Sequence, residues 1–212
     1  MSTPPPPSGA GAPQRAEAPR RAELRRTTRE TAITVRLDLD GTGQATIATG
    51  VGFYDHLWTA FAHHSLIDLE IAATGDLDVD EPHTVEDVAL VVGSALAEAL
   101  GDRAGIVRFG DASVPMDEAL ATAIVDCSGR PYAVLDLTFC GERMGALSTQ
   151  LVEHALEAFA RTGGTTLHVR ASGRNDHHVA EAAFKALARA VRAAVAIDPG
   201  RVGAPSTKGT LR

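Results

Sequence analysis

The sequence from Leu167 to Glu181 reads LHVRASGRNDHHVAE, and it matches an earlier stretch, Leu69 to Glu86, that reads LEIAATGDLDVDEPHTVE. Each stretch begins with an apolar, strand-like segment that ends in glycine, and each finishes in a tail of histidine and glutamate. The aligned tail positions are His83 with His178, Glu86 with Glu181, and Pro82 with His177. Two copies are too few for a solenoid, so the duplication predicts two similar halves related by a pseudo-two-fold axis.

The repeat continues on both sides of these stretches. A helix-like run precedes each one, at 55–64 and at 150–161, and a long amphipathic run follows each one, with apolar residues at helical spacing. Strands outnumber helices and the expected hairpins are local, which favours an α+β fold over a parallel α/β sheet. We therefore predict duplicated half-domains, each a small, mostly antiparallel or mixed four-stranded sheet with two helices on one face.

The same patterns give the expected element limits. We expect strands at 31–39, 44–49, 67–73, 76–80, 120–126, 131–138 and 165–171, and helices at 55–64, 83–100, 148–162 and 176–195. The segment Asp40–Gly43 has the composition of a hairpin turn, with the return strand beginning at Ala45.

The domain limits follow from the repeat. The half-domains are expected to span 27–110 and 111–198, and 199–212 form a C-terminal tail. Residues 1–26 are rich in Pro, Ala and Arg and cannot bury a core, so we expect a disordered arm, with structure beginning near Arg29.

Composition restricts the function classes. The 212 residues carry a net charge of −7, which argues against a general nucleic-acid binder. No apolar run is long enough to span a membrane, and no signal peptide is recognisable. The two cysteines, Cys127 and Cys140, lack a metal-binding spacing and imply no disulfide framework. These features favour a cytoplasmic protein.

The histidines and glutamates of the repeat have the chemistry of a divalent metal site. His83 and Glu86 are three residues apart, as are His178 and Glu181, so each pair lies on one helical face. His177 and His178 are adjacent and point about 100° apart, which indicates two metal ions. The predicted ligands are His56, His83, Glu86, His154, His177, His178 and Glu181.

Other polar residues are candidates for holding a substrate. Ser206 and Lys208 lie beside glycine in the segment Pro205–Gly209, which could cradle a phosphate, although a flexible tail explains it equally well. Arg108 and Arg130 are further candidates, although a loop arginine is more often a solvated surface residue. His64, at the end of the first predicted helix, is a candidate substrate ligand.

Several segments together resemble the imidazoleglycerol-phosphate dehydratase family of histidine biosynthesis. The matching segments are LDGTG at 39–43, FYDH at 53–56, HTVED at 83–87, MDEAL at 116–120, DCSGRPY at 126–132, LVEH at 151–154, HH at 177–178 with EA at 181–182, and PSTKG at 205–209. The resemblance covers residues 24–212. It implies a manganese enzyme that assembles as a 24-mer with active sites between subunits, and it agrees with the duplicated fold.

The resemblance also assigns roles. One Mn²⁺ would take His56, His83, Glu86 and His178. A second would take His154, His177, Glu181 and a histidine at the position where this chain has Pro82, which has no donor atom. Water or Glu81 could replace that ligand. The two ions would stabilise the deprotonated imidazole of the substrate.

The same resemblance implies the reaction and its remaining residues. Loss of the C3 hydroxyl and the C2 proton would give an enol that becomes imidazole-acetol phosphate. Glu30 and Glu181 are the candidates for acid–base catalysis, although Glu30 could equally be an exposed strand-edge carboxylate. Arg108, Arg130, Ser206 and Lys208 would hold the phosphate.

Two other function classes remain open because of Pro82. The chain could be a paralogue that acts on a related phosphorylated imidazole, or a non-catalytic oligomer in which one metal site has decayed. The retained His154, His177 and Glu181 argue against decay.

Overall fold

The computed structural model describes residues 19–211 and contains two halves with closely similar element order. The first half comprises β1 (Arg21–Thr27), β2 (Thr31–Asp38), β3 (Ala45–Ala48), α1 (Gly52–Ser65), β4 (Asp68–Gly75) and α2 (Pro82–Leu100). The second half comprises β5 (Phe109–Met116), β6 (Ala119–Asp126), β7 (Tyr132–Leu137), α3 (Gln150–Gly163), β10 (Thr166–Ser172) and α4 (Asp176–Val195), with a short β8–β9 hairpin (Arg143–Met144, Leu147–Ser148) inserted before α3.

The two main sheets have the same topology. Their strand orders are β1-β2-β4-β3 and β5-β6-β10-β7, and in each sheet the first three strands are antiparallel while the fourth pairs in parallel. The predicted α+β fold with duplicated half-domains is therefore confirmed.

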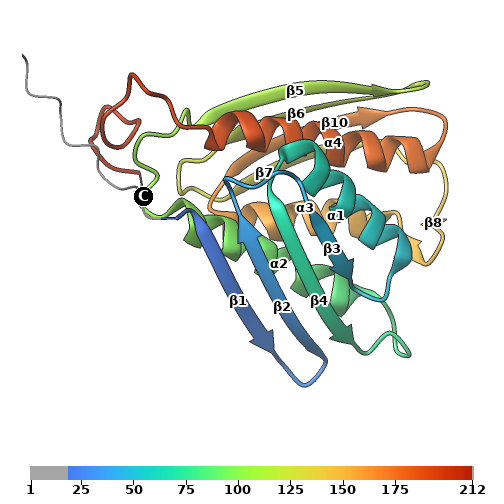
Figure 1. Cartoon of the computed structure of the whole chain (residues 1–212). Coiled ribbons are helices and arrows are strands. Elements are labelled where there is room, and N and C mark those ends of the chain that lie inside the picture. The colour runs from blue at the N-terminus through green and yellow to red at the C-terminus, as the bar shows by residue number, and fades with distance from the viewer. Residues whose placement is uncertain (1–18, 212) are drawn as a thin grey trace, which may run out of the picture.

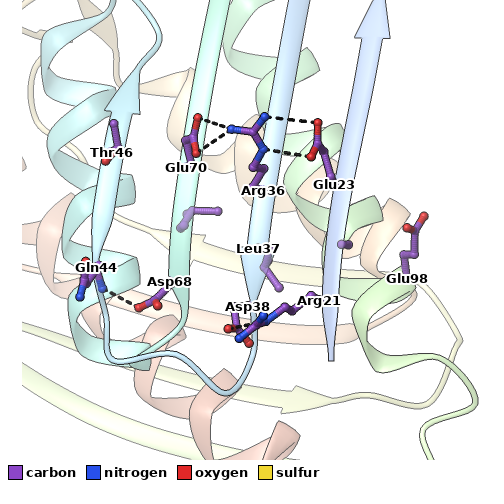
Figure 2. A pocket seen from close by; sticks show the side chains of 12 residues that line it. Arg21, Glu23, Arg36, Leu37, Asp38, Gln44, Thr46, Asp68, Glu70 and Glu98 are labelled. Carbon is purple, nitrogen blue, oxygen red and sulfur yellow. Dashed lines mark hydrogen bonds and ion pairs between the residues drawn. The ribbon is translucent and has the colours of Figure 1, made fainter. Parts of the chain in front are cut away.

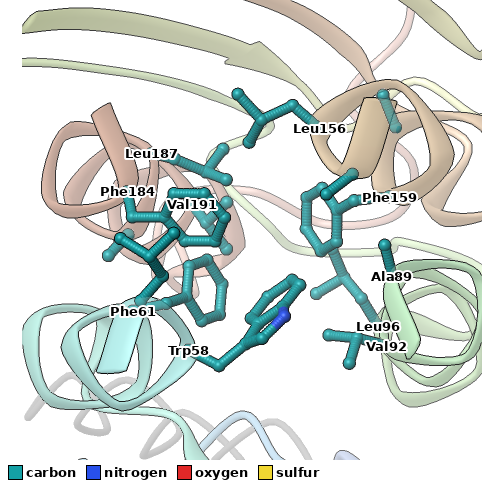
Figure 3. Packing of buried hydrophobic residues seen from close by; sticks show 14 of the residues in the cluster. Trp58, Phe61, Ala89, Val92, Leu96, Leu156, Phe159, Phe184, Leu187 and Val191 are labelled. Carbon is teal, nitrogen blue, oxygen red and sulfur yellow. The ribbon is translucent and has the colours of Figure 1, made fainter. Parts of the chain in front are cut away.

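The helices lie between the two sheets (Figure 1). Helix α1 packs on α4, and α2 packs on α3, so each helix contacts a helix of the other half. Trp58 of α1 connects the helices of the first half to those of the second. Its ring lies 5.5 Å from that of Phe184 on α4 and 6.0 Å from that of Phe159 on α3 (Figure 3). Burying each such aromatic side chain contributes about 1.5–3 kcal/mol, so the interior binds the halves into one body.

Two strand predictions are wrong. Ala45–Ala48 does not return along β2 as a hairpin but pairs in parallel with β4, because α1 carries the chain across to place β4 between β2 and β3. The segment 76–80 is a turn rather than a strand, with Val79 N–H donating to the Asp76 carbonyl at 2.8 Å. Strands β1, β5, β8 and β9 were not predicted.

The predicted disordered arm is also too long, because β1 begins at Arg21 and pairs with β2 along its length. Residues 1–18, which make up the rest of that arm, lie outside the described residues. The remaining predicted strands and helices are confirmed to within a few residues.

The outer faces of the two sheets differ in chemistry. On the first sheet, Arg36 of β2 is bonded to Glu70 of β4 at 2.9 Å and to Glu23 of β1 at 3.0 Å (Figure 2). A hollow of about 470 Å³ lies on this face, but the charged groups of this row already bind one another. On the second sheet the exposed residues include several large apolar ones, namely Phe109, Leu120, Ile124, Tyr132 and Val134.

Candidate active site

Three predicted ligands meet between α1 and α4. Helix α1 supplies His56, and α4 supplies His177 and Glu181 from its first turns. Nε2 of His56 lies 2.9 Å and Nε2 of His177 lies 3.0 Å from the same Oε2 of Glu181. Each residue offers one donor atom within 4.8 Å of the other two. Two imidazoles and one carboxylate in this arrangement match the three-ligand set of a catalytic metal site.

The start of α4 fixes this geometry. The Asn175 side chain accepts a hydrogen bond from His177 N–H at 3.0 Å and caps the helix, which places His177 and Glu181 one turn apart on one face. The ring of Phe53 lies 4.7 Å from that of His177. The cap of α4 and the ring of Phe53 on α1 thus orient the His177 imidazole toward α1.

Glu181 is buried and fully engaged. Its Oε1 accepts from Nζ of Lys185 at 2.6 Å, a residue that the sequence reasoning missed although its i+4 spacing from Glu181 on a helix was visible. Burial raises the pKa of Glu181, but the hydrogen bonds from His56 and Lys185 outweigh it and lower that pKa to about 2. The side chain is therefore a carboxylate at neutral pH and suited to ligation.

A second pair occupies the equivalent place between α2 and α3. Nε2 of His154 lies 3.0 Å from Oε2 of Glu86, and Arg161 donates to Oε1 of Glu86 at 2.7 Å. The hydrogen bonds from His154 and Arg161 hold the pKa of Glu86 below its usual value, although partial burial opposes them. Pro82 stands at the first position of α2, four residues before Glu86, and supplies no donor.

Glu81 does not take the missing ligand's place. Its Oε1 accepts from Ser148 N–H at 3.1 Å and from Arg143 at 2.9 Å, and the residue is buried against the β8–β9 hairpin. Glu81 thus anchors that hairpin to α2.

The grouping of ligands differs from the predicted one. His56 was expected with Glu86, and His177 and Glu181 with His154 and position 82. In the structure, His56 instead lies with His177 and Glu181, and His154 lies with Glu86. The cause is that each site forms between helices of opposite halves, which the spacing within one helix cannot reveal.

His83 and His178 face away from these clusters. Nδ1 of His83 lies 3.0 Å from Asp76 and 3.9 Å from Glu30, and Nδ1 of His178 lies 2.9 Å from Glu118. The bond to Asp76 raises the pKa of His83. Asp76 and Glu118 each fix one ring nitrogen of their histidine, as the outer partners of metal-bound histidines do, whereas Glu30 is too distant for a hydrogen bond. Asp76 and Glu118 were not predicted.

The C-terminal tail forms a separate cavity of about 550 Å³. Its lining includes the four predicted phosphate ligands Arg108, Arg130, Ser206 and Lys208, together with Ser128 and Arg201, which were missed. Arg108 binds both oxygens of Asp126, at 2.7 and 3.0 Å, and donates to the Pro205 carbonyl at 2.8 Å. The tail is thus tied to the second sheet, and basic groups with hydroxyls line one concavity.

His64 lies apart from that cavity, on the last turn of α1. Burial lowers its pKa, and the charge of Lys185 lowers it further, which favours the neutral imidazole. Within residues 19–211, no side-chain hydrogen bond or ion pair links the tail cavity to the histidine clusters.

Sequence comparisons agree with these features. A protein-family model described as imidazoleglycerol-phosphate dehydratase matches residues 49–191. A protein of that name from Methanoculleus marisnigri is 54% identical over 189 residues, which cover 89% of this chain and 98% of the relative. One from Acidiphilium cryptum is 55% identical over 190 residues, which cover 89% of this chain and 97% of the relative.

Solved structures give the same result. The crystal structure of imidazoleglycerol-phosphate dehydratase from Staphylococcus aureus superposes with a TM-score of 0.76 at 36% identity and covers 84% of this chain and 99% of that chain. That of IGPD from Pyrococcus furiosus in complex with (S)-C348 has a TM-score of 0.76 at 38% identity and covers 89% and 100%. Among residues 19–211, no helix has the length and apolarity required to cross a membrane. The chain belongs to the imidazoleglycerol-phosphate dehydratase family, a family of hydro-lyases.

Proposed function

We propose that this protein dehydrates imidazole-glycerol phosphate to imidazole-acetol phosphate in histidine biosynthesis and depends on a divalent cation, Mn²⁺, for this reaction. The observation that carries the proposal is the His56–His177–Glu181 cluster in a chain of this family. A cation bound there would act as a Lewis acid on an imidazole nitrogen of the substrate.

The chain's own groups account for the remaining requirements. The cationic and hydroxyl groups of the tail cavity, Arg108, Arg130, Ser206 and Lys208, suit the phosphate. His64, whose lowered pKa favours the neutral imidazole, is a further candidate for contact with the substrate.

Proton transfer is assigned to Glu30 rather than Glu181. Both oxygens of Glu181 are occupied by side-chain partners, whereas the Glu30 side chain is half exposed and, within residues 19–211, has only the 3.9 Å approach of His83. Glu30 would accept the C2 proton as the C3–O bond breaks, and the departing hydroxyl would take a proton from solvent and leave as water; Glu30 would later return its proton to solvent. The enol so formed would tautomerise to the ketone.

Self-association completes the proposal. His83 and His178 lie outside both clusters of their own chain, so they would act as ligands by reaching the clusters of neighbouring copies. The apolar outer face of the second sheet offers a contact surface, and the expected assembly is a 24-mer with active sites between subunits. The proposed location is the cytoplasm, and both cysteines are free thiols, as a reducing compartment requires.

The test is turnover of imidazole-glycerol phosphate by Mn²⁺-loaded protein, with loss of one water followed by mass spectrometry. His177→Ala should abolish the product, whereas Glu70→Gln, on the ion-paired outer face of the first sheet, should retain wild-type turnover. Wild-type protein that binds Mn²⁺ and gives no product would refute the proposal.

Pro82 supports one alternative, a paralogue that acts on a related phosphorylated imidazole or is not catalytic. Mn²⁺ binding without turnover of imidazole-glycerol phosphate would favour it, and screening of other phosphorylated imidazoles would then separate its two forms.

A further inference from the structure

The two clusters are equivalent under the internal repeat, which allows a direct comparison. His56 on α1 corresponds to His154 on α3, and Glu181 on α4 corresponds to Glu86 on α2. The His–Glu distance is 2.9 Å in the first cluster and 3.0 Å in the second. Helix packing has therefore kept both sites in the same geometry.

Each carboxylate also binds one cationic side chain, although Lys185 lies on the same helix as Glu181 and is largely buried, whereas Arg161 reaches Glu86 from α3 and is exposed. Oε1 of Glu181 accepts from Lys185 at 2.6 Å, and Oε1 of Glu86 accepts from Arg161 at 2.7 Å. In both cases Oε2 faces imidazole nitrogen. The second cluster thus differs from the first in one donor, because His177 corresponds to Pro82.

No neighbouring group makes up this difference. Glu81 is turned away into its bonds with Arg143 and Ser148, and within residues 19–211 His56–His177–Glu181 is the only set of three donors close enough to share an ion. Both carboxylates have a cationic partner, so the missing donor decides the difference: a cation is held more weakly by the two donors of the second cluster than by the three of the first.

We propose that each copy of this chain binds one divalent cation tightly, at His56–His177–Glu181, and that Glu86, His154 and Arg161 form a fixed ion-pair network instead of a second tight site. This inference deepens the proposed function and rests on it for the role of the bound cation. Loss of a direct ligand should weaken the second site more than about 100-fold, because changes to outer partners alone weaken metal binding about 10–100-fold.

The test is a count of bound metal. Full-length protein is stripped with chelator and titrated with Mn²⁺, with free ion measured by electron paramagnetic resonance and bound ion by elemental analysis. One tight equivalent per chain is expected. His177→Ala should lose it, and His154→Ala should retain it. Two equivalents of similar affinity, or equal losses in the two variants, would overturn the inference.

Position 82 provides a second measurement. Pro82→His should add a second tight equivalent, and Pro82→Leu, which makes the same backbone change without a donor, should not. Circular dichroism confirms that each variant is folded. A folded Pro82→His protein that still binds one equivalent would contradict the assignment of the asymmetry to this residue.

Turnover measured on the same samples separates the two proposals. Product formation with two equal Mn²⁺ sites would overturn the asymmetry and leave the dehydratase function standing. One tight Mn²⁺ per chain without product would support the asymmetry of the two sites and refute the dehydratase function.

Discussion

Glu30 and Glu118 occupy corresponding turns, between β1 and β2 and between β5 and β6, and each faces the Nδ1 atom of a histidine. Their environments differ. Glu118 accepts from His178 and from the N–H groups of Arg174 and Asn175, and the bond to His178 in particular lowers its pKa to about 2. In the described part of the chain, the Glu30 carboxylate accepts no comparable bonds, so Glu30 is the one of the pair that we assign to proton exchange.

Replacing Glu30 by Gln should therefore reduce kcat about 100-fold or more, the usual effect of removing a general base. The count of tightly bound Mn²⁺ should stay unchanged, because Glu30 is not part of the complete cluster. Glu70→Gln, on the outer face of the first sheet, is the matched control. Wild-type kcat in Glu30→Gln would remove Glu30 from the mechanism.

Asp68 gives a prediction about pH. Its Oδ1 accepts from the N–H groups of Thr42 at 2.8 Å and Gln44 at 2.9 Å, and these bonds, led by that from Gln44, lower its pKa. Because the folded-state pKa lies below the unfolded value of about 3.9, the stabilisation is complete above that pH and is lost as pH falls through the folded-state pKa.

Asp68→Asn should thus lower the urea midpoint of unfolding at pH 7 and flatten its fall below about pH 4. Urea unfolding followed by circular dichroism at a series of pH values measures both effects. Parallel pH curves for wild type and variant would show that Asp68 does not contribute.

The ligands themselves could be found at the level of residues, because histidine and glutamate recur in register in both halves. What the sequence could not supply was their grouping. Spacing shows that His177 and Glu181 share a helical face, but the partner of that face is α1 of the other half, and no local pattern states which helices pair. Lys185 and Arg161 were missed for a related reason, since a cation that binds a carboxylate ligand and one that only contacts water look alike in sequence.

At the level of elements, the errors in strand prediction have physical causes. In β1, the outward positions Arg21, Glu23 and Arg25 are charged, and Arg26 follows Ala22 and Leu24 on the inward side, so charge hid the alternation. In β5 the inward side begins with Gly110 and Ala112, which give little apolar signal. The segment 76–80 alternates well, but no strand lies beside it to accept its backbone bonds. The long helices were predicted accurately because their apolar stripes extend over many turns.

Close helix packing between α2 and α3 yields a prediction at this scale. A Cβ atom added to Gly93 would overlap the Thr162 hydroxyl and the Phe159 carbonyl, and it would lie 2.9 Å from Gly163 N. Gly93→Ala should therefore reduce the free energy of unfolding by about 1–3 kcal/mol, the typical effect of overpacking, despite the better helix propensity of alanine.

Gly52→Ala in α1 is the control, because its Cβ would meet nothing within 4 Å. Thermal and urea unfolding should show a loss for Gly93→Ala and none for Gly52→Ala. Equal stability of the two variants would mean that α2 and α3 can move apart without penalty.

For the whole molecule, the two sheets are alike in topology and unlike on their outer faces. Ile124 of β6 occupies the position that Arg36 holds in β2, since Ile124 pairs with His168 where Arg36 pairs with Glu70. The first face thus carries the Glu23–Arg36–Glu70 row, whereas the second carries exposed Ile124 beside Val134. An ion-paired face suits water, and an exposed apolar one suits a contact between copies.

Ile124→Arg should for this reason reduce the size of the assembly, because an unpaired charge would be buried in the contact. Ala32→Arg, which adds the same charge to the polar face of the first sheet, should leave the size unchanged. Light scattering on size-exclusion fractions measures the assembly mass of both variants, with Mn²⁺ and after chelation.

Chelation should also shrink the wild-type assembly, because His83 and His178 would then no longer be held to cations of neighbouring copies. An Ile124→Arg protein with the wild-type mass would place the contact elsewhere, and a wild-type mass unaffected by chelation would show that apolar contact alone holds the copies together.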